Sequence, residues 1–209
     1  MRTEEIWTYV EAERVSLAEL LAGLTAEQWR TPSLCPGWSV QDVAAHVISS
    51  PQARVLPVVA GMVRARGDFN RFVFDEARRA GATYSPGEIL AQYDRYAGSR
   101  RRPVGTVPMD PLLDVLIHGQ DIAVPLGIRR LMPPEAARAA ADRIWVKSFP
   151  FKARRRFAGV RLVATDVDWS AGSGAELRGP IAALLQLLSG RTHVTPQLTG
   201  SGVSHLTDR

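Results

Sequence analysis

The stretch Asp110–Gly127, DPLLDVLIHGQDIAVPLG, decides the fold that we expect for this chain. It predicts a single helix, because Asp110 suits the N-cap, Pro111 suits the first helical position, and Pro125 and Gly127 end helices. At 100° per residue, apolar side chains cover nearly the whole circumference of this helix. A helix that is apolar nearly all round is buried, so we expect it to form the centre of a helical core.

Three polar side chains interrupt the apolar surface of this helix. Asp114, His118 and Asp121 share a wedge roughly 60° wide between the apolar sides. A buried carboxylate or imidazole is costly unless it is paired or bound to a metal. Asp114 and His118 are four residues apart and meet on one face, where they could share one metal ion. The spacing alone leaves two alternatives open, a hydrogen-bonded pair in the core and part of a metal site.

Composition limits the class of protein. A chain of 209 residues fits one domain, or one domain with a small appendage. The net charge is +5, but the arginines are dispersed apart from two short clusters, so we expect no nucleic-acid partner. The single Cys35 excludes an internal disulfide and favours a reducing cytoplasm. Neither a signal-peptide pattern nor an apolar run long enough to span a bilayer is present, and we expect no membrane partner.

The rest of the N-terminal part also has helical character. Periodicity predicts helices over residues 3–24, 58–80 and 85–99, and another that begins at Pro133. Ser39 and Asp42 match a capping box before an apolar run. His46 projects from the edge of that run's apolar stripe, where a lone histidine is more often structural than a ligand.

The character of the chain changes after Phe151. Alternating β-branched and aromatic residues predict a strand over Val160–Trp169, followed by a turn at SAGSG and a short returning strand at AELRG. A helix should follow Pro180 and end at Gly190. The tail, VTPQLTGSGVSHLTDR, is expected to add a last short strand. We therefore expect a mainly α protein with a helical bundle over residues 1–150 and a small α+β subdomain over residues 151–209.

Three stretches together resemble a known family. They are LCPGWSVQDVAAH at 34–46, DVLIHGQDIAVPLG at 114–127, and LVATDVDWSAGSGAELRGPIAALLQLLSGR at 162–191. The chain is similar to the actinobacterial mycothiol-dependent maleylpyruvate isomerase family, within the wider DinB-like metalloenzyme group. The resemblance implies a DinB-like four-helix bundle and a divalent metal, zinc above all, held by His46, Asp114 and His118. Two histidines and one carboxylate leave open coordination positions, as a catalytic zinc site requires.

The resemblance also implies a reaction. The metal would hold the thiolate of mycothiol, which attacks a small electrophilic substrate in an isomerase or thiol-transferase reaction. Better-characterised members carry Glu where this chain has Asp114, so the ligand distance or the helix position must differ. Asp121 lies one turn beyond His118, where it could orient the imidazole, or it could pair elsewhere. Cys35 is expected to be a packed structural thiol, and Arg178 or Arg191 to contact an acidic substrate.

Two other function classes remain open at this point. The first is a non-catalytic DinB-like protein that keeps the metal for binding or interaction. The second is a metal-dependent hydrolase that uses bound water, although the sequence offers no dedicated general base beyond Asp121. Bundles of this kind often pair through helix faces, so a homodimer is also considered.

Overall fold

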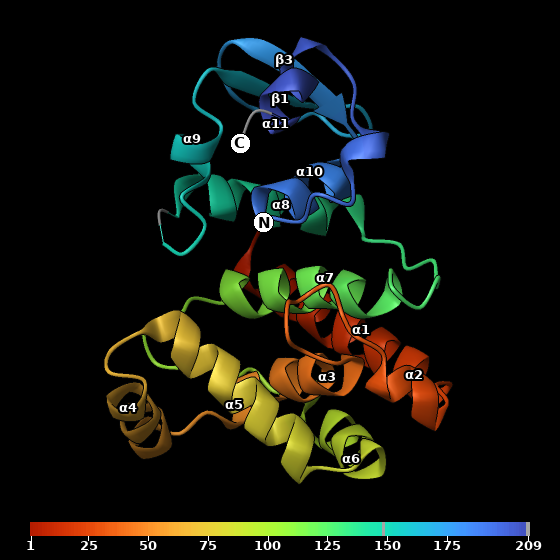
Figure 1. The fold of residues 1–209 in the computed structure, drawn as a ribbon, viewed down its shortest axis with the longest axis vertical. Coiled ribbons are helices and arrows are strands. Elements are labelled where there is room, and N and C mark those ends of the chain that lie inside the picture. Colours follow the sequence, from red (N-terminus) through yellow and green to blue (C-terminus); the bar gives the residue numbers. More distant parts are fainter. Residues whose placement is uncertain (148, 208–209) are drawn as a thin grey trace. The chain divides into compact units, whose positions relative to one another are not determined.

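The structure, a computed structural model, describes residues 1–147 and 149–207. The chain divides into two compact units, Met1–Arg130 and Leu131–Arg209 (Figure 1). Within the described residues, no helix is long and apolar enough to cross a membrane.

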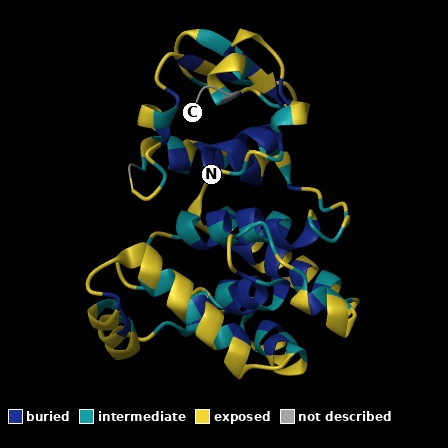
Figure 2. Ribbon diagram, viewed as in Figure 1, coloured by how far each residue is buried: buried dark blue, intermediate teal, exposed yellow. Residues whose placement is uncertain are grey.

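Four helices of the first unit, α1, α3, α6 and α7, form a bundle around one core. Both α1 and α3 pack against α6 and α7, and the inward faces of these helices are buried (Figure 2). Three further helices pack around the bundle: α2 and α5 pack against α3, and α4 packs against α5. The bounds are α1 Thr3–Ala22, α2 Ala26–Arg30, α3 Val40–Ser49, η1 Ser50–Gln52, α4 Val55–Arg64, α5 Phe69–Thr83, α6 Pro86–Tyr96 and α7 Met109–Ala123.

Capping residues set several helix starts as the sequence predicts. The Ser39 hydroxyl accepts from the Asp42 amide and the Asp42 carboxylate accepts from the Ser39 amide, which begins α3. The same reciprocal pair at Ser85 and Glu88 begins α6. The predicted start of α7, at Pro111, was wrong by two residues. The helix begins at Met109, and Asp110 accepts a hydrogen bond from the Val107 amide instead of acting as the N-cap.

The second unit contains a small sheet flanked by helices. Strand β1 lies in the middle, antiparallel to β2 and parallel to β3, with Leu162 opposite Ala171 and Leu177. Helix α10 packs against α8 and β1. The bounds are α8 Pro134–Val146, α9 Ala153–Arg156, β1 Val160–Ala164, β2 Ser170–Gly172, β3 Ala175–Gly179, α10 Ile181–Leu188, η2 Thr195–Gln197, η3 Ser201–Val203 and α11 Ser204–Thr207.

The strands differ from the prediction. The predicted strand 160–169 stops at Ala164, because the chain turns there and the Asp166 carboxylate accepts from the Ile181 amide. The segment predicted as a turn contains β2. Strand β3 pairs with β1 in parallel, whereas a strand that returns after a turn would run antiparallel to it. The tail forms η2, η3 and α11 with one isolated bridge between Arg178 and Thr199, and its residues 208–209 lie outside the described chain.

Packing groups α8 with the second unit, since α8 packs against α10. The division into units therefore falls at residue 130, before the domain boundary that we expected at residue 150. All three residues that the resemblance suggests as metal ligands lie in the first unit.

Candidate metal centre

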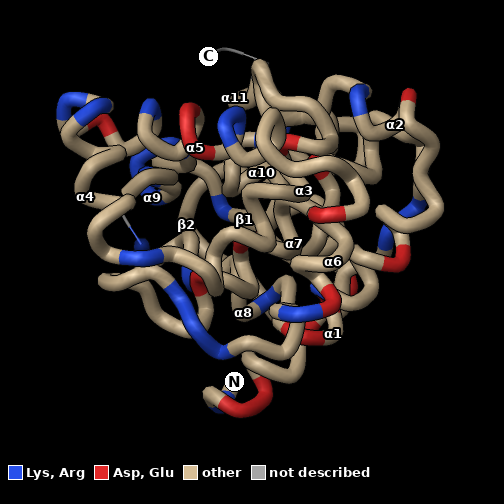
Figure 3. Tube along the Cα trace, turned by 90° about the horizontal axis from the view of Figure 1, so that it is seen from below, with Lys and Arg blue, Asp and Glu red and all other residues tan. Residues whose placement is uncertain are grey.

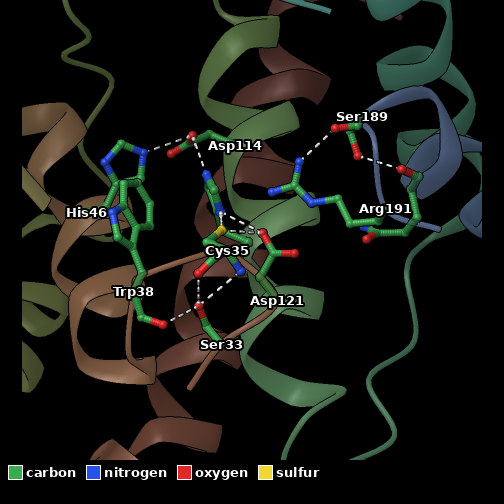
Figure 4. A network of polar contacts seen from close by, with 10 residues as sticks. Ser33, Cys35, Trp38, His46, Asp114, Asp121, Ser189 and Arg191 are labelled. Atoms are coloured by element: carbon green, nitrogen blue, oxygen red, sulfur yellow. Dashed lines mark hydrogen bonds and ion pairs between the residues drawn. The ribbon is translucent and has the colours of Figure 1, made fainter. Parts of the chain in front are cut away.

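The packing of α3 against α7 brings the three expected ligands together. His46 lies on α3, and Asp114 and His118 lie one turn apart on α7. The side chains of His46 and Asp114 point toward each other (Figure 4). The Asp114 Oδ1 atom is 3.5 Å from His46 Nε2 and 3.5 Å from His118 Nε2. One ligand atom from each of the three residues falls within 4.8 Å of the other two. The arrangement therefore brings a carboxylate oxygen and two imidazole nitrogens to one point.

These separations fit a metal ion better than direct hydrogen bonds. A charge-assisted hydrogen bond between imidazole and carboxylate is about 2.7–2.9 Å long. Nitrogen and oxygen ligands that lie about 2.0–2.2 Å from a tetrahedral zinc ion are separated by about 3.3–3.6 Å. The two distances of 3.5 Å from Asp114 fall in the second range. The residues present thus fit a divalent metal with a His, His, carboxylate set.

A second group of potential ligands lies behind His118. The Asp121 Oδ2 atom accepts from His118 Nδ1 at 2.8 Å and from the Cys35 thiol at 3.1 Å, and Cys35 Sγ is 3.6 Å from His118 Nδ1. The separation of 2.8 Å is too short for two ligands of one tetrahedral ion and is typical of a hydrogen bond. This second group is therefore a hydrogen-bonded support for His118, although its atoms also lie within 4.8 Å of one another.

Asp121 orients the candidate ligand His118. Its side chain is fully buried, so a carboxylate there needs strong hydrogen-bond donors. By accepting a hydrogen bond from Nδ1, it fixes the ring so that Nε2 of His118 is directed toward Asp114. This is the orienting arrangement that the sequence suggests for Asp121.

The loop before α3 is fixed to α7 through backbone and side-chain contacts. The Leu34 amide donates to the Asp121 carbonyl at 3.1 Å, and the Ser33 hydroxyl donates to the Trp38 carbonyl at 2.9 Å. These bonds hold Cys35 and Trp38 against the candidate ligands. Cys35 is half-buried and donates to Asp121, which agrees with a packed thiol.

Trp38 forms one wall of the centre. Its ring centroid is 5.1 Å from that of His46 and 6.0 Å from that of His118, and the residue is buried. Its indole Nε1 is buried and has no hydrogen-bond partner in the described part of the chain. The candidate ligand side chains keep some exposure, 20% for His46, 29% for Asp114 and 14% for His118. The candidate ligands are therefore partly open to solvent.

Arg14 supplies a buried positive charge near Asp114. It is only 1% exposed, and its Nη1 donates to the carbonyls of Ala97 and Ser99 at the end of α6. Desolvation raises the pKa of the Asp114 carboxyl, but the two histidines and Arg14 outweigh it and hold that pKa below its ordinary value of 3.8. Asp114 is thus an ionised carboxylate, the form that binds a metal.

Sequence reasoning missed Arg14 and Trp38. Arg14 occupies the gap between Val10 and Leu17 in the apolar stripe of the first helix, where an apolar residue is expected. A charged residue at such a position is a signal for a buried partner, and it was available from the spacing. Trp38 lies in a loop, where periodicity predicts no orientation.

The two arginines that we expected at an acidic substrate both lie in the second unit. Arg178 pairs with Glu176 at 3.0 Å on an exposed surface. Arg191 donates to the Ser189 carbonyl at 2.9 Å (Figure 4). A contact of either residue with a substrate stays a prediction.

The fold and this set of residues define a class: a four-helix bundle with a small α+β unit, in which two histidines and a carboxylate could hold a metal. Residues 10–110 match the family described as the mycothiol maleylpyruvate isomerase N-terminal domain, so this part of the chain is similar to that family. The matched segment includes His46 and ends just before Asp114 and His118.

Two solved structures share the fold over almost the entire chain. One is a crystal structure of the mycothiol-dependent maleylpyruvate isomerase, with a TM-score of 0.66 at 16% identity. The other is a crystal structure of a mutant of the same isomerase in which a histidine is replaced by alanine, with a TM-score of 0.64 at 16% identity. In each case the match covers 96% of this chain and 93% of the other. No sequence among curated proteins matches the chain significantly.

Proposed function

We propose that the chain is a metal-dependent enzyme that uses a low-molecular-weight thiol, mycothiol, in an isomerase or thiol-transferase reaction on a small electrophilic substrate. The observation that carries the proposal is the convergence of His46, Asp114 and His118 at ligand-to-ligand separations. The family match and the shared fold with a mycothiol-dependent maleylpyruvate isomerase support the choice of thiol and reaction.

The residues of the chain have separate tasks in this proposal. His46, Asp114 and His118 would hold the divalent ion, for which zinc is our expectation. When bound, such an ion supplies Lewis acidity that favours the thiolate form of a coordinated thiol. Asp121 holds the ring of His118 in one orientation, and Trp38 excludes water from one side of the centre. The Cys35 thiol donates a hydrogen bond to Asp121, so we assign it a supporting role and not that of a nucleophile.

The first test is elemental analysis of the purified protein, alone and after incubation with zinc. We expect about one divalent metal per chain in the wild type and loss of this metal in His118→Ala. His205→Ala is the matched control, because His205 is exposed and lies in the second unit, and it should keep the metal. A wild-type protein that stays metal-free after incubation with zinc would overturn the proposal.

The second test separates a thiol enzyme from a hydrolase. The protein is loaded with Co²⁺ and titrated with mycothiol while its absorption spectrum is recorded. We expect a sulfur-to-cobalt charge-transfer band that is absent from His118→Ala. The rate at which the substrate is consumed is then measured with and without mycothiol, first for maleylpyruvate and then for other small electrophiles. Turnover that proceeds equally well without thiol would favour the hydrolase instead.

A further inference from the structure

Helix α4, Val55–Arg64, exposes apolar side chains on one face. Val55, Leu56, Val59 and Val63 are 59%, 81%, 53% and 72% exposed. At 100° per residue these four side chains fall within an arc of about 100°. An exposed cluster of large apolar side chains on one helix face marks an interaction site.

The opposite side of α4 attaches the helix to the first unit. Gly61 is buried there, and a Cβ atom added to it would approach the Phe72 ring of α5 within 2.4 Å. The close approach of Gly61 to α5 therefore fixes which face of α4 is turned outward. The outward face is the apolar one, and α4 lies at the edge of the first unit, outside α5 (Figure 1).

Arginines surround this apolar face. Arg54 precedes α4, Arg64 ends it and Arg66 follows it, and all three are exposed. Arg64 pairs with Glu76 at 3.4 Å, whereas Arg54 and Arg66 form no ion pair with any residue that the structure describes. Residues 54–79 contain six arginines and three acidic residues, and α4 itself has no acidic residue (Figure 3). The occupant of this face should therefore be apolar and negatively charged at its rim.

A second copy of the chain fits this requirement poorly. A two-fold pairing of α4 with α4 in antiparallel orientation would bring Arg54 of one copy toward Arg64 and Arg66 of the other, which places like charges together. A folded protein partner fits poorly as well, since a standard protein interface uses about 20–30 residues on each side. The apolar face of α4 offers four.

We propose that α4 is a peripheral docking helix for an anionic lipid surface. Val55, Leu56, Val59 and Val63 enter the boundary between headgroups and acyl chains, while Arg54, Arg64 and Arg66 contact the anionic headgroups. An apolar helix face bordered by arginines is the pattern of a helix that lies in a membrane interface. Such a helix needs no run long enough to span the bilayer, which is the ground on which the sequence predicted no membrane partner.

The docking helix is separate from the candidate metal centre. None of the residues of α4 belongs to the candidate ligand set or to its hydrogen-bonded support. The inference therefore stands or falls independently of the proposed enzyme activity.

The test is co-sedimentation of the full chain with vesicles. Phosphatidylcholine vesicles are compared with vesicles of equal parts phosphatidylglycerol and phosphatidylcholine at low ionic strength. We expect binding to the anionic vesicles that weakens as salt is added, and little binding to the neutral vesicles. Absence of binding to the anionic vesicles would overturn the proposal.

Variants assign the binding to α4. Leu56→Ser should reduce the affinity for anionic vesicles, while Leu131→Ser, which changes a 73% exposed leucine of the second unit, should not. Arg54→Gln and Arg66→Gln should each reduce the affinity for anionic vesicles by about five-fold, and the control Arg101→Gln should leave it unchanged. Equal binding by wild type and Leu56→Ser would contradict the proposal. Self-association in the absence of lipid would also contradict the proposal if Leu56→Ser abolished it, because a second copy of the chain would then occupy this face.

Discussion

His118 faces a carboxylate at each of its ring nitrogens. Nδ1 donates to the buried Asp121 carboxylate at 2.8 Å, and Nε2 faces Asp114 at 3.5 Å. A carboxylate behind a ligating histidine fixes the ring and increases the electron-donating power of its other nitrogen. The hydrogen bond to Asp121 should therefore influence metal affinity although Asp121 is not a proposed ligand.

Asp121→Asn tests this role. The amide oxygen can still accept a hydrogen bond, but its negative charge is lost, and we expect zinc affinity to fall about 10–100-fold. The measurement is competition with a chromophoric chelator, and Asp75→Asn on the exposed surface of α5 is the control. An unchanged affinity in a folded Asp121→Asn protein would show that Asp121 serves only the packing of the loop.

Residue-level prediction worked where local geometry decides the outcome. Asp114, His118 and Asp121 share one face of a helix because their spacing requires it, and the structure brings all three to the same side of α7. The distance from His46 to Asp114 depends on how two helices pack, so spacing could not predict it, and the expectation came from the family resemblance. The pairing of Arg14 with the end of α6 spans more than eighty residues of sequence and was missed.

At the level of elements, α3 and α5 approach each other closely at Gly81. A Cβ atom added there would lie 2.1 Å from the Asp42 Oδ1 atom and 2.9 Å from its Cα atom. Asp42 is also the capping-box residue of α3, so it cannot move away without losing its hydrogen bonds to Ser39. The contact therefore requires glycine.

Gly81→Ala should destabilise the protein by about 1–3 kcal/mol, because the added methyl group overpacks the contact between α3 and α5. Gly87→Ala on α6 is the matched control. Nothing lies within 4 Å of its added Cβ atom, and the change should stabilise the helix by about 0.5–1 kcal/mol. Urea unfolding measures both values. A Gly81→Ala protein as stable as Gly87→Ala would show that the helices can separate freely.

The elements that sequence predicted best are those whose ends are fixed locally. Capping boxes at Ser39 and Ser85 predicted two helix starts correctly. The small sheet was harder, because β2 contains glycine and serine, which are typical of turns, and forms only through its pairing with β1. The direction of β3 is likewise decided by pairing and not by its own residues.

The first unit as a whole is closed by a buried ion pair. Arg130, its last residue, donates to the Glu13 carboxylate at 2.7 Å and to the Glu13 carbonyl at 3.0 Å. Burial raises the pKa of the Glu13 carboxyl above its ordinary value of 4.5, although Arg130 acts in the opposite direction. The folded state therefore binds this proton more tightly than the unfolded chain does.

The stability of the protein should depend on pH through Glu13. Its contribution is fully present below pH 4.5 and is lost as the pH rises through the raised pKa. Relative to wild type, Glu13→Gln should therefore become progressively more stable from about pH 4.5 upward. Urea unfolding between pH 4 and pH 7 measures the difference, with Glu27→Gln as the exposed control. The prediction would be contradicted if the stability difference between Glu13→Gln and wild type did not change with pH, or if it fell as the pH rose.

The first unit should also fold and bind metal without the second. It has its own core, and His46, Asp114, His118 and Asp121 all belong to it. We expect a chain of residues 1–133 to unfold cooperatively and to keep its zinc affinity within about ten-fold of the full chain. Circular dichroism and chelator competition test both points. An unfolded fragment would show that the second unit is needed for the core.

The position of Trp38 gives the protein an optical reporter. Its indole lies 5.1 Å from the ring of His46, well within the range at which a bound paramagnetic ion shortens the lifetime of an excited indole. Loading with Cu²⁺ or Co²⁺ should therefore quench the tryptophan fluorescence in proportion to the fraction of metal sites filled. Trp38→Phe should remove most of this quenching. Filling, emptying and inhibition of the centre can then be followed in real time by fluorescence, without a dye.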